Sequence, residues 1–179
     1  MNIERADYGT IVTFGTLEDL NTKLKIENKK LEEIKDCIDD NGISLLEHCL
    51  ISRKFDIANE ILNLKPKINV VTKEGLNEFH CISANMKTLN AYDIAYKLLD
   101  MGVSLLQQEK KYGNTALFSF CYNINDKIDD IRLEFLKVCI NRLTQRELDI
   151  KNKAGNSVKS IIIERGPNEL KQLIKSLKL

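Results

Sequence analysis

The residues best suited to nucleophilic chemistry in this chain are a histidine and two cysteines. His80 is followed directly by Cys81, and Cys121 lies on a similar apolar segment further along the chain. An imidazole can activate a neighbouring thiol as a nucleophile, so this trio is the best candidate for an enzyme site. The alternative is a hydrogen-bonded structural histidine beside thiols that pack in a core. We favour the alternative and predict that the chain is not an enzyme and has no catalytic residues.

The other candidate ligands do not have the spacing of a metal site. The five cysteines are scattered and form no CxxC pair, and His48 lies 32 residues from His80. Zinc needs clustered ligands, and scattered thiols are typical of reduced cytoplasmic proteins. The acidic runs "LEDL" (17–20) and "DKIDD" (126–130) are predicted to lie in surface turns, without the glycine that a calcium loop requires. We therefore predict no metal and no cofactor.

Composition narrows the class of protein. The 179 residues suffice for one domain, and Lys+Arg 27 against Asp+Glu 26 gives a net charge of +1. Nucleic-acid and membrane-surface proteins normally carry a basic excess, so neither partner is expected. The N-terminus has no leader pattern, and no apolar run reaches the roughly 18 residues of a membrane span. With only 2 prolines and 8 glycines, the chain is predicted to be an all-α protein of the cytoplasm.

A glycine-centred motif occurs four times. Each copy has Gly, one variable residue, then Ser, Asn or Thr, and then an apolar run with helical spacing. The copies are "NGISLLEHCL" from Asn41, "EGLNEFHCIS" from Glu74, "YGNTALFSFC" from Tyr112 and "AGNSVKSIII" from Ala154. Their glycines are 33, 38 and 42 residues apart. A repeat is therefore predicted, with glycine at a turn and the hydroxyls of Ser44, Thr115 and Ser157 as helix caps.

The first interval predicts the layout of a unit. Apolar residues after Gly42 have helical spacing, and residues 53–64 contain a second apolar stripe. Pro66 is predicted to stop this second helix, and residues 67–75 run extended to the next glycine. The unit is helix, turn, helix and extended finger.

This unit resembles the ankyrin repeat, whose signature includes G-x-T-P-L-H. Gly113, Thr115 and Leu117 match it in one copy, and Gly75 and His80 in another. The resemblance implies one ankyrin-like solenoid of helix-turn-helix repeats with short extended fingers, and a hydrogen-bonded role for His80. The predicted parts are a degenerate unit at 1–38 and repeats at about 39–71, 72–109, 110–151 and 152–179.

Several segments depart from the family pattern. The motif proline is absent from every copy, and residues 86–91 and 123–131 are insertions between predicted helices. An additional short helix is expected within 27–40, and the spacing of Thr144 and Glu147 predicts a capping box. Residues 1–13 are compatible with a strand, an arm or the first helix of the degenerate unit.

The resemblance also implies a binding face formed by the fingers and the first helices. Its variable positions are Lys73, Glu74, Leu76, Asn85, Lys111, Tyr112, Asn114, Tyr122, Asn123, Lys153 and Asn156. The two tyrosines are either interface anchors or partly buried props between units. Finger lysines (Lys73, Lys110, Lys111, Lys151 and Lys153) would form a basic ridge that attracts an acidic partner or serves only solubility.

The expected function is that of a non-enzymatic protein-binding module. A small, stand-alone, degenerate repeat chain resembles immunity proteins, which bind and neutralise a cognate toxin. The alternative is a secreted effector or viral host-range protein that binds a host factor. Either partner is another protein, and the fold alone does not choose between them.

Overall fold

The computed structural model describes residues 1–122, 124–125 and 127–177. This part of the chain is helical apart from its loops and two isolated β-bridges, so the prediction of an all-α protein is confirmed. None of its helices has both the length and the apolar character needed to cross a membrane. The helices are α1 (Tyr8–Phe14), α2 (Leu17–Ile26), α3 (Leu31–Ile34), α4 (Leu45–Ile51), α5 (Phe55–Asn63), α6 (Glu78–Ser83), α7 (Leu89–Asp100), α8 (Ala116–Cys121), α9 (Asp130–Asn141), α10 (Gln145–Leu148), α11 (Val158–Arg165) and α12 (Asn168–Ser176).

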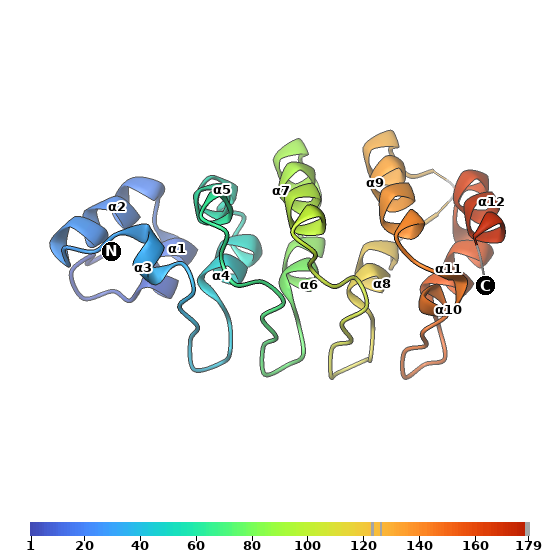
Figure 1. The fold of residues 1–179 in the computed structure, drawn as a ribbon, viewed down its shortest axis with the longest axis horizontal. Helices are drawn as coiled ribbons and strands as arrows, with labels where there is room; N and C mark the ends of the chain where they lie inside the picture. Colours follow the sequence, from blue (N-terminus) through green and yellow to red (C-terminus); the bar gives the residue numbers. More distant parts are fainter. Residues whose placement is uncertain (123, 126, 178–179) are drawn as a thin grey trace.

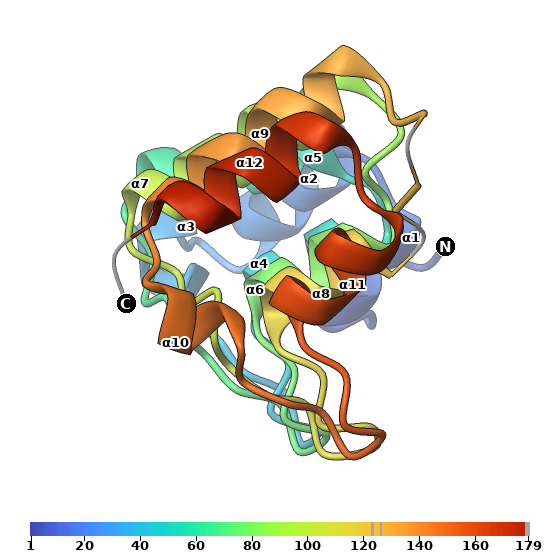
Figure 2. The same ribbon diagram turned by 90° about the vertical axis from the view of Figure 1, so that its right-hand side faces the viewer.

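Pairs of helices follow one another along the long axis of the molecule (Figure 1). The first helices α1, α4, α6, α8 and α11 form one layer, in which each contacts the next. The second helices α5, α7, α9 and α12 do the same in the other layer, which also contains α2. Seen end-on, the members of each layer lie one behind another (Figure 2). The core therefore runs between the two layers through every pair.

Four loops connect the successive pairs and project from the same side of the molecule (Figure 1). They are loop 1 (35–44), loop 2 (64–77), loop 3 (101–115) and loop 4 (149–157). One backbone hydrogen bond joins each loop to the next: Lys73 N–H to Asn41 C=O (2.9 Å), Lys110 N–H to Glu74 C=O (2.8 Å) and Lys153 N–H to Tyr112 C=O (2.9 Å). These bonds make the four loop tips a continuous ridge.

Each loop ends in the predicted glycine turn and helix cap. The glycines Gly42, Gly75, Gly113 and Gly155 have φ angles of +79°, +82°, +71° and +80°. A Cβ atom is strained in this left-handed region, which explains the choice of glycine. The caps are Ser44, Asn77, Thr115 and Ser157, whose side chains accept a backbone N–H at the start of α4, α6, α8 and α11. The predicted turn and cap chemistry is confirmed.

Two of these glycines provide a test of how much the ridge contributes to stability. A Cβ on Gly75 would lie 3.1 Å from the carbonyl oxygen of Gln108 and the amide of Lys110 in the next loop, whereas one on Gly155 would meet open space. Gly155→Ala should therefore cost only the left-handed strain, about 1 kcal/mol. Gly75→Ala should cost about 2 kcal/mol, because loop 3 must also move. Urea unfolding of both variants measures the difference, and equal losses would contradict close packing between the loops.

The aromatic part of the core lies between the third and fourth pairs, α6/α7 and α8/α9. Phe135 of α9 is fully buried, and its ring centroid lies 5.2 Å from those of Phe120 and Tyr96. Phe120 in turn meets Phe79 at 5.8 Å. All five cysteines are free, and four are buried: Cys49, Cys81, Cys121 and Cys139. The prediction that the thiols are mostly buried is confirmed, and Cys37 is the exposed one.

Some predicted boundaries were wrong. The run 17–20 lies inside α2 rather than in a surface turn, because Asp19 accepts the amide of Thr16 at 2.8 Å and completes a capping box. The predicted insertion 86–91 includes the start of α7, which begins at Leu89. The predicted end of the second helix before Pro66 is met, since α5 ends at Asn63 and Lys65 then adopts a φ of +51°.

Other expectations about these segments are met. Residues 1–13 contain most of α1, so the first helix is the correct alternative among the three. A short additional helix, α3, lies within 27–40. The predicted capping box of Thr144 and Glu147 opens α10.

Candidate functional site

The trio of His80, Cys81 and Cys121 lies in buried surroundings, where the imidazole is hydrogen-bonded to backbone groups. Nδ1 of His80 accepts the backbone N–H of Asn77 at 3.2 Å, and Nε2 lies 3.3 Å from the carbonyl oxygen of Asn114. Burial lowers the pKa of His80, and it raises the pKa of Cys81 and raises that of Cys121 to about 12. Both thiols therefore stay protonated, and both imidazole nitrogens are occupied.

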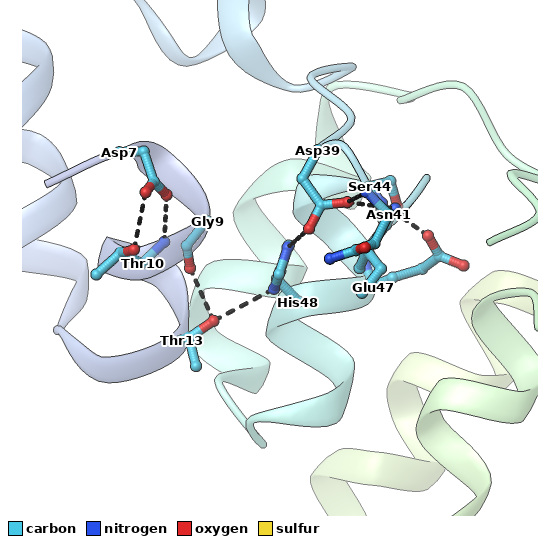
Figure 3. A network of polar contacts seen from close by, with 10 residues as sticks. Asp7, Gly9, Thr10, Thr13, Asp39, Asn41, Ser44, Glu47 and His48 are labelled. Atoms are coloured by element: carbon cyan, nitrogen blue, oxygen red, sulfur yellow. Dashed lines mark hydrogen bonds and ion pairs between the residues drawn. The ribbon is translucent and has the colours of Figure 1, made fainter. Parts of the chain in front are cut away.

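A second imidazole, His48, belongs to a network that the sequence did not predict (Figure 3). Its Nε2 lies 3.1 Å from Oδ2 of Asp39, and its Nδ1 lies 3.3 Å from Oγ1 of Thr13. The order of acid, imidazole and hydroxyl is that of a nucleophilic triad. However, the hydroxyl of Thr13 already donates to the carbonyl of Gly9 at 2.7 Å. The hydroxyl proton of Thr13 is therefore not directed at the imidazole, and the network holds α1 against α4 and loop 1.

Metal binding has no candidate among the described residues, where no three His, Cys, Asp or Glu side chains are grouped so that they could hold an ion. The acidic run 126–130 includes Asp126, which lies outside the described residues. Within that run, Asp129 caps α9 by accepting the amide of Arg132 at 2.9 Å. This carboxylate serves as a helix cap.

A groove of about 720 Å³ lies between loops 3 and 4 and the helices α8 and α11. It is lined by Lys111, Tyr112, Asn114, Phe118, Tyr122, Asn152, Lys153, Ala154, Asn156, Ile161, Glu164 and Arg165. Phe118 and Ile161 are buried, whereas Tyr112 and Tyr122 are 56% and 65% exposed. The groove thus combines an apolar base with two accessible aromatic rings. We take it as the candidate site.

Hydrogen bonds within and between the two loops fix the shape of this groove. Oδ1 of Asn152 accepts the amides of Ala154 (3.0 Å) and Asn156 (2.9 Å). Its Nδ2 donates to Oδ1 of Asn114 in loop 3 at 2.7 Å. The side chain of Asn152 therefore holds loop 4 in shape and ties it to loop 3. The groove is preorganised in this way, which reduces the entropy lost when a partner binds.

Six of the predicted binding residues line this groove: Lys111, Tyr112, Asn114, Tyr122, Lys153 and Asn156. Lys73, Glu74 and Leu76 lie in loop 2, at its tip and next to its turn, outside the groove lining. Asn123 lies outside the described residues.

Asn85 corrects the prediction. It is only 7% exposed, and its amide nitrogen donates to the carbonyls of Leu50 (2.8 Å) and Ile51 (2.9 Å) at the end of α4. Its Oδ1 accepts Nε of Arg53 at 2.7 Å. The side chain therefore satisfies carbonyls that the end of α4 leaves unpaired, and it is not available to a partner.

The sequence reasoning missed one wall of the groove. Glu164 and Arg165 at the end of α11 form an ion pair of 3.2 Å and line the groove. They occupy the end of a first helix, and Tyr122 holds a similar position as the residue that directly follows α8. Applying the same positional rule to the last repeat would have found them.

Comparison with known proteins adds no family. The chain matches no protein-family model, and no curated protein matches it.

Proposed function

We propose that residues 1–179 form an ankyrin-like solenoid that acts as a non-enzymatic protein-binding module. The stacked helix pairs, the ridge of loops and the glycine turn before each new first helix support this proposal. In such stacks, neighbouring units together create an extended binding face. The proposed units are those expected from the sequence, at about 1–38, 39–71, 72–109, 110–151 and 152–179.

The groove is the observation that carries the proposal. It brings together side chains from two loops and two helices, including the exposed rings of Tyr112 and Tyr122. Aromatic residues with a polar tip contribute most to protein interfaces because they bury a large area with few rotatable bonds. The two rings are therefore proposed as anchors for a partner protein.

A narrower proposal concerns the identity of the partner. We propose that the chain is an immunity protein, which binds and neutralises a cognate toxin in the cytoplasm. Free thiols fit the reducing environment of that compartment. The direct test is to co-express the protein with products of adjacent genes and to measure both cell survival and complex formation. A complex with a host protein instead, without protection, would favour the effector alternative.

The groove can be tested with the same partner. The double variant Tyr112→Ala and Tyr122→Ala should weaken the complex about thirtyfold, because both anchors are lost. Calorimetry on the purified complex measures the loss. Leu89→Ala is the matched control, since Leu89 is 64% exposed on α7 and lies outside the groove. Equal affinities for the parent and the double variant would place the interface elsewhere.

A further inference from the structure

We infer that the partner segment recognised by the groove is acidic and that its carboxylates bind between Lys111 and Lys153, beside the ring of Tyr112. This inference rests on the proposed protein-binding function and adds the chemistry of the bound segment. Three observations carry it: the length of loop 3, the position of Glu109 and the environment of the two lysines.

Loop 3 contains one residue more at its tip than the other loops. In loops 1, 2 and 4 the glycine amide donates to the carbonyl three residues earlier, as Gly155 does to Asn152 at 3.0 Å. In loop 3, Gly113 donates to Glu109, four residues earlier, at 3.1 Å. The wider turn places two successive lysines and Tyr112 at the tip next to the groove.

Glu109 stabilises this wider turn from the inside. Its carboxylate accepts the amides of Lys111 (2.6 Å), Tyr112 (2.9 Å) and Asn114 (2.9 Å). Although burial opposes ionisation, these N–H groups lower the pKa of Glu109. Asp39 and Asn152 do the same in loops 1 and 4 with shorter side chains across shorter turns. The carboxylate of Glu109 thus bonds to backbone amides and forms no ion pair with a lysine among the described residues.

The two groove lysines are held in place by neutral groups. Nζ of Lys153 donates to the carbonyl of Lys110 at 2.5 Å, and Nζ of Lys111 lies 4.8 Å from the ring centroid of Tyr112. In the described part of the chain, neither forms an ion pair, whereas Lys23, Lys29 and Lys137 do. With Arg165 against Glu164, the lining carries a net charge of +2. The charge of Glu109 acts on Lys111 from within loop 3, but neither ammonium group is held in an ion pair with a residue that the structure describes, which favours binding of carboxylates.

The basic surface is too local to favour a nucleic acid. Loop 1 carries Asp39 and Asp40 and no lysine after Lys35, so the ridge changes sign along its length. A duplex or a long single strand needs a continuous basic track, and the net charge of the whole chain is only +1. A short acidic peptide segment fits the two basic loops and the aromatic rings between them.

The test uses a fluorescently labelled oligoglutamate peptide of about ten residues, which can extend across two loops. Fluorescence anisotropy should show binding that weakens with added salt. The variant Lys111→Gln with Lys153→Gln should lower the affinity about tenfold. Lys171→Gln with Lys175→Gln removes the same charge from α12 and should leave the affinity unchanged.

A second variant changes the shape of the turn in loop 3 and keeps the net charge of the protein. Glu109→Asn combined with deletion of Lys110 turns the sequence of loop 3 into Gln-Asn-Lys-Tyr-Gly-Asn, close to Lys-Asn-Lys-Ala-Gly-Asn in loop 4, and leaves the net charge unchanged. It should keep the thermal midpoint and lose affinity for the peptide. No binding of oligoglutamate, equal losses in the α12 control, or tighter binding of an oligothymidylate of equal length would each overturn the inference. The protein-binding proposal would survive these results if Tyr112→Ala with Tyr122→Ala still weakened the protein complex.

Discussion

Phe135→Ala is expected to lower the free energy of unfolding by about 4 kcal/mol, because it leaves a ring-sized cavity in a core that cannot close around it. The ring of Phe135 is fully buried and lies edge-on to Tyr92 and Tyr96, with Phe120 of α8 tilted against it. The loss would remove a large part of the 5–15 kcal/mol that is typical of a folded domain. Because α8 also forms a wall of the groove, the variant should lose peptide affinity too.

Urea unfolding followed by circular dichroism measures this loss. Phe135→Leu keeps most of the volume and should cost about 1 to 2 kcal/mol. Phe14→Ala is the surface control, since Phe14 is 77% exposed, and it should change stability by less than about 0.5 kcal/mol. A Phe135→Ala variant as stable as the surface control would mean that the two layers do not share one core at this pair.

Local chemistry made much of the fold predictable. The turn glycines and the caps after them recur as short motifs, because a positive φ and an unpaired amide each restrict the residue type. Amphipathic spacing located α4 and α5 in the same way. These signals act within about four residues, so a single sequence contains them.

The parts that were missed depend on contacts between distant residues. The network of His48 joins Thr13 and Asp39, and it forms only because α1 packs against α4. Asn85 has the sequence context of an exposed helix end, yet the neighbouring helix α4 takes its amide. The extra residue of loop 3 was hidden because insertions between helices also lengthen the intervals between glycines. These three features can be recognised only when the positions of the helix pairs relative to one another are known.

Glu47→Gln is expected to raise the stability of the protein at about pH 8 by as much as about 3 kcal/mol. Glu47 and Glu78 are both fully buried between α4 and α6. Oε2 of Glu47 accepts the amide of Ser44 at 2.7 Å, and the thiol of Cys81 lies 3.9 Å from its Oε1. Burial, and then the charge of Glu78, raise the pKa of Glu47 to about 7 despite the hydrogen bonds from Ser44. Glutamine keeps the capping acceptor and removes the buried charge.

The sign of the pH dependence follows from this raised pKa. The unfolded chain releases the proton of Glu47 near its ordinary value of 4.5, whereas the folded protein keeps it up to about pH 7. Between these values the folded state binds more protons, so stability falls as the pH rises and then levels off. Glu78 acts in the same direction, because burial raises its pKa and its Oε2 has no hydrogen-bond partner among the residues that the structure describes. The contribution of Glu47 and Glu78 should therefore make the parent protein more stable at about pH 5 than at about pH 8.

Glu147→Gln is the matched control, because Glu147 occupies the same capping position on the exposed helix α10. Hydrogen bonds from Thr144 lower the pKa of Glu147. Glu147→Gln should therefore weaken the helix cap slightly and leave the fall in stability between about pH 5 and about pH 8 as it is in the parent. Urea midpoints of the parent and both variants, measured from about pH 5 to about pH 8, give the comparison. If Glu47→Gln loses stability with pH in parallel with the parent, Glu47 is not the proton carrier. The pH dependence would then belong to Glu78, and Glu78→Gln should flatten the profile instead.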